Sequence, residues 1–460
     1  MTRVLLLATT TGYQTRAFGE AAERLGVELV FATDRCHLIE DPWQDGAIAI
    51  RFHDEDPSVA AILDSAVRRP IDGLVVVGDR PTVIAARVAE RLGLPWHPAD
   101  AAAAARHKER TRERLRDAGL PVPWWFSVSV NAPSPTLTGS PAVRREPSGI
   151  GHQPLIYPCV VKPVSLSGSR GVMRADDPAS FDAAFERLCA LMRSPDVRAE
   201  RNQAHETALV EGFIPGREYA VEALMHRGEL HVLAIFDKPD PLDGPFFEET
   251  IYIAPSSAPA AVQTLIVDAV SRAVNALGLH HGPVHAECRV NEEGVFVLEV
   301  AARPIGGLCA RAIRFSRIPD PESRVPLLPN PESLIPISFE ELLLRHALGE
   351  DPRAWCRERD ASGVMMIPIP RGGMYRGAGG IDGARAVPGV DDIQITAKTD
   401  QRLVPLPEGA SYLGFIFARA LHGRDVEHAL RAAHARLTFA IDAELPVLTS
   451  AQIHYNRDHG

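Results

Sequence analysis

The chain has 460 residues, of which 45% are hydrophobic and 23% charged, an ordinary composition for a globular protein that predicts about three domains with separate cores. A net charge of -10, with no basic run interleaved with aromatics, argues against a nucleic-acid partner. Six scattered cysteines and the lack of an apolar run of about 18 residues argue against a disulfide framework, a cysteine zinc site and membrane insertion, so we expect a cytoplasmic protein.

The first part of the chain, residues 1–97, predicts a small doubly wound domain. Residues 4–8 and 71–77 are short continuous apolar runs, which are typical of parallel strands buried on both faces, and a helical pattern covers 15–25. The dinucleotide fingerprint Gly-x-Gly-x-x-Gly is missing after the first run, at residues 9–13. We therefore expect a Rossmann-like domain that does not bind NAD.

Two proline-rich stretches divide the rest of the chain. A helical pattern at 99–119 opens a second unit, 98–318. Within it, an aperiodic stretch of Pro, Gly and Ser at 131–155 predicts a mobile surface loop. Further prolines predict an irregular connection at 319–337.

A third unit follows at 338–460. It contains glycine-rich turns and two helical patterns, at 339–348 and 425–440. Because helix and strand patterns alternate along the chain, we expect an α/β and α+β multidomain protein.

A predicted hairpin carries two glutamates. Residues 284–303 favour two strands joined by a three-residue loop, 292–294, with Gly294 in the left-handed conformation. This loop sets Glu287 opposite Glu299, with Cβ atoms roughly 4.5–5.5 Å apart. Like charges this close favour a cation between them, and carboxylate oxygens suit Mg²⁺. The alternative is a pair of solvent-facing strands whose charges are screened by water.

Lys162 ends an apolar strand and precedes a loop of small residues. Such a loop lets several backbone N–H groups approach a phosphate chain, while the lysine supplies a point charge. The Gly-Lys-Ser/Thr ending of a Walker loop is absent, and a solvated strand-ending lysine is the alternative. The candidate phosphate-binding residues of the loop are Ser165, Ser167, Gly168, Ser169 and Gly171.

The order of these motifs resembles the ATP-grasp superfamily. The chain has a lysine on a helix (Lys108), then Lys162 with its loop, then Glu-x-hydrophobic-hydrophobic-x-Gly-x-Glu at 211–218, and finally two carboxylates before an arginine. The resemblance covers residues 1–318. The ending Glu-x-Ala-Ala-Arg at 299–303 is similar to the L-amino acid ligase (dipeptide synthetase) branch.

This resemblance implies an ATP-grasp fold. The N-terminal pre-ATP-grasp domain would be 1–97, and the ATP-grasp domain would be 98–318 with a lid at 120–215. The third unit, 338–460, is similar to the C-terminal α+β domain of the branch.

The resemblance also implies roles for individual residues. Lys108, Lys162 and the small-residue loop would contact the phosphates of ATP. Glu287 and Glu299 would hold Mg²⁺ or Mn²⁺, and Arg303 would stabilise charge on the transferring phosphoryl group or on a tetrahedral intermediate. The nucleoside would be bound by the backbone of Glu211, Gly212, Phe213 and Ile214 and by the carboxylate of Glu218.

Several positions depart from the family pattern or carry no expected role. Ala301 replaces an asparagine that many members have after the second metal carboxylate, and Tyr252 stands where the branch often has histidine. Gly307 stands where branch members carry an aromatic residue. A glycine at this position would leave room for a larger substrate. His281 and His285 are four apart, but Gly-Pro lies between them, so we expect structural roles for both.

These features predict an ATP-dependent carboxylate–amine ligase that joins amino acids or close analogues through an acyl phosphate and releases ADP and phosphate. Lys238 would reach the γ-phosphate or the substrate carboxylate, or else is a surface lysine before a proline. The alternatives are an ATP-grasp enzyme that activates bicarbonate or formate, and a catalytically silent nucleotide-binding protein. We expect small-molecule carboxylate and amine substrates, no nucleic-acid or membrane partner, and, by the resemblance, a homodimer.

Overall fold

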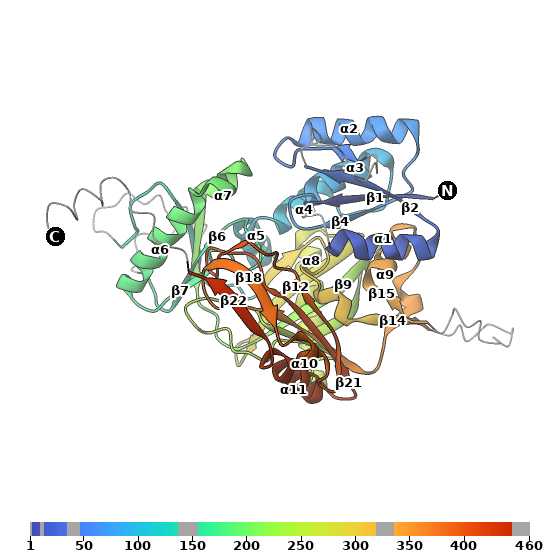
Figure 1. Ribbon diagram of the computed structural model, residues 1–460. Coiled ribbons are helices and arrows are strands. Elements are labelled where there is room, and N and C mark those ends of the chain that lie inside the picture. Colours follow the sequence, from blue (N-terminus) through green and yellow to red (C-terminus); the bar gives the residue numbers. More distant parts are fainter. Residues whose placement is uncertain (1, 10–12, 35–46, 137–154, 319–334, 444–460) are drawn as a thin grey trace.

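The computed structural model describes residues 2–9, 13–34, 47–136, 155–318 and 335–443. Most of the expected loop 131–155 and of the expected connection 319–337 lies outside these residues. The described part of the chain is built around one eight-stranded antiparallel sheet, to which smaller units attach (Figure 1).

The N-terminal unit is a four-stranded parallel sheet with the strand order β3-β2-β1-β4. Its apolar runs form strands because both faces are covered: Leu5 and Leu7 belong to one hydrophobic core, and Val4 and Leu6 to another. The elements are β1 (Arg3–Ala8), α1 (Tyr13–Leu25), β2 (Glu28–Thr33), β3 (Ile48–Ala49), α2 (Glu55–Arg68), β4 (Gly73–Val77) and α3 (Thr82–Leu92).

The helix expected at 99–119 is two helices, α4 (Ala99–Ala105) and α5 (Lys108–Asp117). The break lies at His107, whose ring accepts a hydrogen bond from the backbone N–H of Arg110 at 3.4 Å and so caps α5. The single-helix prediction is wrong, because periodicity alone did not reveal this cap. The break puts Lys108 at the first position of α5, where its backbone N–H donates to the carbonyl of Val164 at 2.9 Å.

A four-stranded antiparallel sheet with the order β5-β8-β6-β7 lies within the stretch expected to be the lid. The helix α6 packs on β6 and β7, and a capping box between Asp177 and Ser180 starts it. The elements are β5 (Trp125–Ser129), β6 (Cys159–Pro163), β7 (Met173–Ala175), α6 (Pro178–Met192), α7 (Pro195–Ala199), the 3-10 helix η1 (Gln203–Glu206) and β8 (Thr207–Gly212).

The central sheet has the order β13-β12-β9-β10-β11-β17-β21-β19. Its last three strands come from the C-terminal unit, so the sheet runs without interruption from the second predicted unit into the third. The elements up to this crossing are β9 (Arg217–His226), β10 (Glu229–Asp237), β11 (Ile251–Ala254), α8 (Ala260–Leu277), β12 (Gly282–Asn291), β13 (Gly294–Ala301) and the 3-10 helix η2 (Cys309–Ala312).

One face of the central sheet packs on α8, and the other carries the polar residues described below. Val221 and Ala286 point to the α8 face and share a core with Val270, whereas their strand neighbours Glu222 and Glu287 point the opposite way. The period-two alternation of β9 and β12 therefore separates a packing face from a functional face.

The β12–β13 hairpin sets Glu287 opposite Glu299, as predicted, but with a different loop. Asn291 pairs with Gly294, so the turn has two residues, and Gly294 (φ 128°) belongs to β13. A bulge at Leu298 then shifts the register by one residue and restores the opposition of the two glutamates. The three-residue loop is wrong, and the bulge compensates for it.

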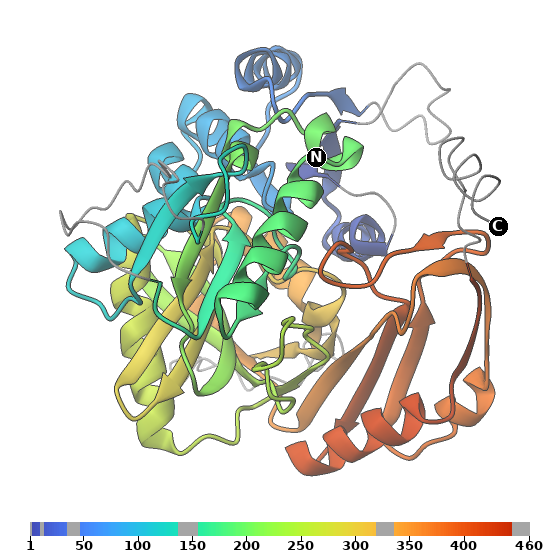
Figure 2. The same cartoon turned by 90° about the vertical axis from the view of Figure 1, so that its left-hand side faces the viewer.

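The C-terminal unit covers its strands with α11, which lies along their outer side in Figure 2. The helix expected at 425–440 ends earlier, because residues after it pair with β18 as an antiparallel strand. The elements are β17 (Ala361–Ile367), β18 (Gly373–Gly379), α10 (Ile381–Arg385), β19 (Val390–Ile395), β20 (Arg402–Leu403), β21 (Gly414–Ala420), α11 (Gly423–His434) and β22 (Thr438–Asp442).

A small sheet and one helix link the central sheet to the N-terminal unit. The predicted helix at 339–348 is confirmed as α9, which packs on α1 and β4 and lies beside α1 in Figure 1. The elements are β14 (Arg314–Arg317), β15 (Ile337–Ser338), α9 (Phe339–Ala347), the 3-10 helix η4 (Pro352–Ala354) and β16 (Trp355–Arg357). Among the described helices, none combines the length and apolarity that a bilayer span needs.

Candidate functional site

A cavity of about 530 Å³ opens between the four parts of the molecule, within the size range of small-ligand sites. The N-terminal unit contributes Asp79, the lid contributes Lys162, the central sheet contributes Glu287, and the C-terminal unit contributes Tyr412. The predicted site residues that line it are Lys108, Lys162, Ser167, Gly168, Ser169, Glu211, Gly212, Phe213, Ile214, Glu218, Glu287, Glu299 and Arg303.

Both predicted lysines point into this cavity, and each has partners within the protein. The ammonium of Lys108 donates to the carbonyl of Leu166 at 2.8 Å and lies 3.2 Å from a carboxylate oxygen of Glu299. Lys162 forms an ion pair with Glu211. The small-residue loop thus folds back over Lys108, and the two cations lie on the same side of the cavity.

The side chain of Glu211 has a role that the motif did not reveal. It forms buried ion pairs with two cations, Arg112 and Lys162. The guanidinium of Arg112, fully buried, donates to both Glu211 oxygens at 3.0 and 3.3 Å. Burial alone would raise the pKa of Glu211, but Arg112 and Lys162 outweigh it and lower this pKa to about 2. Burial lowers the pKa of Lys162 to about 8, which Glu211 only partly offsets.

The predicted adenine-binding backbone is partly engaged. The N–H groups of Gly212 and Phe213 donate to the carbonyls of Trp124 and Pro158, at 2.9 and 3.1 Å. The N–H groups of these two residues therefore already have partners within the protein. The side chain of Phe213 stacks with Phe247 at 6.3 Å between ring centroids, which gives this end of the cavity an apolar wall suited to a flat ring.

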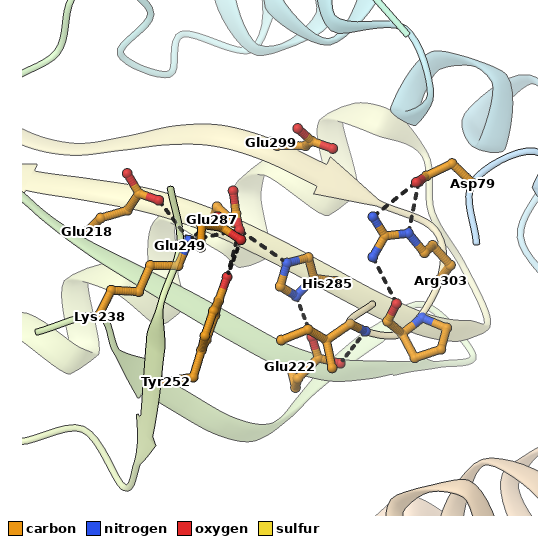
Figure 3. Close-up of polar contacts among 12 residues, drawn as sticks. Asp79, Glu218, Glu222, Lys238, Glu249, Tyr252, His285, Glu287, Glu299 and Arg303 are labelled. Carbon is orange, nitrogen blue, oxygen red and sulfur yellow. Dashed lines mark hydrogen bonds and ion pairs between the residues drawn. The ribbon is translucent and has the colours of Figure 1, made fainter. Parts of the chain in front are cut away.

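A cluster of carboxylates surrounds Lys238. Its ammonium lies 2.7 Å from Glu218, 2.7 Å from Glu249 and 2.9 Å from Glu287, as the dashed lines in Figure 3 show. The hydroxyl of Tyr252 donates to Glu249 at 2.8 Å. Lys238 is buried at the site, so the surface-lysine alternative is wrong.

The charges of this cluster depend on one another. Burial lowers the pKa of Lys238, but the three carboxylates outweigh it and hold that pKa well above its usual value. Burial raises the pKa of Glu287, but Lys238 and His285 hold it well below its usual range. Burial, with repulsion from Glu287, raises the pKa of Glu249 to about 7.

Oxygen donors for a divalent cation are present in this wall. Oxygens of Glu218, Glu249 and Glu287 lie within 4.8 Å of one another, and such hard donors fit Mg²⁺ or Mn²⁺. Glu299 lies opposite Glu287 in the strand register, but its carboxylate points away from this cluster in Figure 3. It pairs instead with Lys108. The predicted pair thus faces one cavity with separate partners.

Arg303 does not point freely into the cavity. Its guanidinium makes two hydrogen bonds, of 2.9 and 3.1 Å, to the carboxylate of Asp79 in the N-terminal unit (Figure 3). Burial lowers the pKa of Arg303, but Asp79 outweighs it and raises that pKa, so the arginine stays charged. The strand-end position of Asp79, after an apolar run, was the available signal for this missed residue.

His285 lies at the site, although its spacing from His281 pointed to a structural role. It bridges Glu222, through Nδ1, and Glu287, through Nε2 at 3.5 Å. Burial lowers the pKa of His285, but the two glutamates outweigh it and raise that pKa to about 9. Burial also raises the pKa of Glu222, so the pair retains its shared proton at neutral pH.

The far end of the cavity is apolar and is formed by residues of the C-terminal unit together with Gly307 and Cys309. Gly307 (φ 64°) lies against Phe415, whose ring would be only 3.1 Å from an added Cβ. The room expected beside Gly307 is therefore filled by an aromatic ring from another part of the chain. Tyr412, Met366 and Cys309 complete this wall.

Three family sequence models match consecutive parts of the chain. An ATP-grasp N-terminal domain matches residues 19–96, an ATP-grasp domain matches 155–312, and the L-amino acid ligase C-terminal domain 2 matches 365–442. The predicted resemblance is confirmed on all three parts.

Individual proteins with similar sequences or folds agree with these matches. The crystal structure of L-amino acid ligase from Bacillus licheniformis superposes with a TM-score of 0.75 at 26% identity, covering 96% of this chain and 99% of that one. Alanine–anticapsin ligase from Bacillus subtilis (strain 168) is 30% identical over 238 residues, 48% of this chain and 46% of that protein. Carnosine synthase 1 from Gallus gallus is 28% identical over 328 residues, 67% of this chain and 33% of that protein.

The chain spans less than half the length of these two curated relatives. The structural superposition, by contrast, covers nearly the whole of both chains, including the crossing of the central sheet into the C-terminal unit. The chain therefore belongs to the ATP-grasp family and has the domain arrangement of an L-amino acid ligase.

Proposed function

We propose that the protein is an ATP-dependent carboxylate–amine ligase that joins two amino acids or close analogues. One observation supports this most strongly: a single cavity holds two lysines beside a small-residue loop, a wall of carboxylates, and a buried arginine. Binding a nucleotide alone would not require the buried arginine or the wall of carboxylates. The names of the relatives describe ligases and a synthase, in line with this proposal.

Each group has a part in this proposal. Lys108 and Lys162 would contact the phosphates, and the backbone of residues 165–171 would close over them. Phe213 and Phe247 would enclose the adenine, and Glu218 would take the ribose hydroxyls after releasing Lys238. The domain limits predicted from the sequence remain part of the proposal.

Glu287 and Glu299 would hold the divalent cation, for which Mg²⁺ fits the oxygen donors best and Mn²⁺ is the alternative. When bound, the cation neutralises phosphate charge. Lys238 would turn toward the γ-phosphate or the substrate carboxylate once Glu287 has another partner. Arg303, fixed by Asp79, would stabilise negative charge on the transferring phosphoryl group.

The reaction would take two steps. A carboxylate oxygen attacks the γ-phosphorus, the bond to the β-phosphate oxygen breaks, and ADP leaves an acyl phosphate. The amine nitrogen then attacks the acyl carbon, the carbon–oxygen bond to phosphate breaks, and the nitrogen gives up a proton as the amide forms. Glu249, with a pKa of about 7, is a suitable acceptor for that proton.

The apolar end of the cavity suits the side chain of one substrate. Phe415, Tyr412 and Met366 would pack on an apolar side chain, while the charged head of the substrate lies toward Lys238 and Arg303. We therefore propose that at least one substrate is an amino acid with an apolar or aromatic side chain.

The test is ADP release measured with ATP, Mg²⁺ and a panel of amino acid pairs, with product masses determined in parallel. Turnover that needs both a carboxylate and an amine, with an amide product, supports the proposal. Turnover with bicarbonate or formate and no amino acid would replace it with the first alternative. The panel should include pairs with an apolar or aromatic member.

The silent nucleotide-binding alternative needs its own experiment. Glu299→Gln removes a proposed cation ligand but keeps the size of the side chain. We expect nucleotide binding to persist and ADP production to fall by about 10²-fold or more. Equal ADP production in the variant and the parent would end the assignment of Glu299. A homodimer and a cytoplasmic location stay predictions.

A further inference from the structure

Three histidines gather beneath α9, at the end of the central sheet away from the cavity. His226 ends β9, His281 directly precedes β12, and His346 lies in α9. His226 is four residues along β9 from Glu222, about 13 Å away. The cluster is therefore separate from the site described above, and none of its members lines the cavity.

The three rings are buried and face one another. Their relative exposures are 6%, 3% and 3%, and one ring nitrogen from each lies within 4.8 Å of the others. Nδ1 of His226 lies 3.2 Å from Nε2 of His346. The rings of His281 and His346 stack at 4.2 Å between centroids.

His281 is the anomaly in this cluster. Neither of its ring nitrogens has a hydrogen-bond partner among the described residues; the backbone of His346 affects its pKa but forms no well-aligned hydrogen bond with it. A buried polar group without a partner costs about 1–3 kcal/mol. His97, which is also buried nearby, has both nitrogens engaged, with the carbonyl of Pro283 at 3.0 Å and the N–H of His280 at 3.2 Å.

One separation matches a tetrahedral imidazole site. Zinc–nitrogen bonds of about 2.0–2.1 Å place two ligand nitrogens about 3.3–3.4 Å apart. The nitrogens of His226 and His346 already lie at 3.2 Å, and the His281 ring would have to turn out of its stack with His346 to bring in the third. Imidazole donors select zinc and its transition-metal neighbours rather than magnesium.

We propose that His226, His281 and His346 bind one divalent transition-metal ion of the zinc class. Such an ion would fasten α9 to β9 and β12 and would stabilise the junction with the N-terminal unit, without taking part in the ligase reaction.

The test uses the full-length protein without a histidine tag. The protein is stripped with a chelator, loaded with Zn²⁺ or Co²⁺ in the presence of excess Mg²⁺ and ADP, and dialysed. The proposal predicts one retained zinc per chain, a higher melting temperature with zinc, and the strong visible absorption of tetrahedral Co²⁺ bound by nitrogen. Less than a tenth of an equivalent retained by the folded parent protein would overturn it.

Variants locate the ion. His281→Ala and His346→Gln should each lower zinc retention at least tenfold, with the circular dichroism of the metal-free parent preserved. His280→Ala is the matched control, because that exposed neighbour lies next to the cluster in the chain and should retain zinc. Should the variants fail to fold, the zinc content and the cobalt spectrum of the parent protein still decide the question. A folded His281 variant that retains as much zinc as the parent refutes the site. This outcome is independent of the ligase assay.

Discussion

The charged side chains of the cavity are paired with one another rather than left exposed. Lys108, Lys162, Lys238 and Arg303 each contact a carboxylate. An unpaired buried charge would be costly, so the protein supplies internal partners. Substrate phosphates would displace some of these partners. Because binding phosphate requires a charged lysine, the pH at which a lysine loses its proton can be tested through activity.

Lys162 predicts a pH dependence. Its pKa in the folded protein is lowered to about 8, so the side chain is charged below that pH and loses its charge above it. We expect kcat/KM for ATP to fall as the pH rises through about 8, because the quotient reports on the free enzyme. Lys162→Arg keeps a charge at all these pH values and should remove that fall, although its absolute rate will be lower. The same fall in both proteins would show that another group titrates.

Glu211 predicts a large effect on stability. Glu211→Gln leaves the fully buried Arg112 and Lys162 without their carboxylate, and breaking a buried pair costs about 3–5 kcal/mol. Asp117→Asn, on the exposed end of α5, is the control and should cost less than about 1 kcal/mol. Denaturant unfolding of the three proteins measures this, and similar midpoints would contradict the buried network.

At this scale the sequence predicted which residue types would meet, but not how they pair. Glu287 and Glu299 were expected from the predicted hairpin, and Arg303 was expected because the order of the motifs resembles a family pattern. Asp79 and Glu249 were not, because no motif marked them: the fold brings Asp79 to Arg303, and Glu249 to Lys238 and Tyr252. His285 was misjudged because the helical spacing test does not apply to a strand.

Among the elements, the lid is docked on a loop of the C-terminal unit. The N–H of Gly171 donates to the carbonyl of Pro407 at 2.8 Å, and Arg170 donates to the carbonyl of Glu408 at 2.7 Å. The side chain of Glu408 also pairs with Arg187 on α6. The lid therefore has a latch that lies outside the cavity.

This latch predicts that a substitution in it changes the ratio of ADP released to amide formed, rather than the stability of the protein. Because the Arg187–Glu408 pair is half exposed, Glu408→Gln should change stability by less than about 1 kcal/mol. We expect more ADP released per amide formed, since a looser lid admits water to the acyl phosphate. Glu186→Gln, on the same helix, is the control. An unchanged ratio of ADP to amide would mean that the latch does not control closure.

The β12–β13 hairpin shows what element-scale patterns can predict. Strand alternation and a glycine-containing turn located the hairpin and its glutamate pair. The two-residue turn and the bulge at Leu298 could not be predicted, because the register depends on packing against β9 and α8 rather than on the turn residues.

For the whole molecule, the Asp79–Arg303 pair connects the N-terminal unit to the central sheet. Asp79→Asn should weaken this connection by about 2 kcal/mol, less than the 3–5 kcal/mol of a fully buried pair, because the Asp79 side chain is 18% exposed. It should also lower kcat by releasing Arg303. Glu90→Gln, exposed on α3, is the control. Calorimetry and ADP release measure both effects, and an unaltered melting profile with full activity would contradict the role of this contact.

Unit-scale patterns in the sequence predicted the parallel N-terminal sheet and the helix α9. They did not predict that β11 pairs with β17, because that pairing joins Tyr252 to Val364 across more than a hundred residues and leaves no local signal. The predicted third unit is therefore continuous with the second through the central sheet, and the apolar end of the cavity depends on this continuity.

The most direct test of the proposed chemistry is oxygen transfer from the carboxylate substrate. A substrate pair that supports ADP release is used with ¹⁸O in the carboxylate, and the released phosphate is analysed by mass spectrometry. Activation through an acyl phosphate predicts one heavy oxygen in each phosphate formed with amide. Unlabelled phosphate, with amide still produced, would contradict the account.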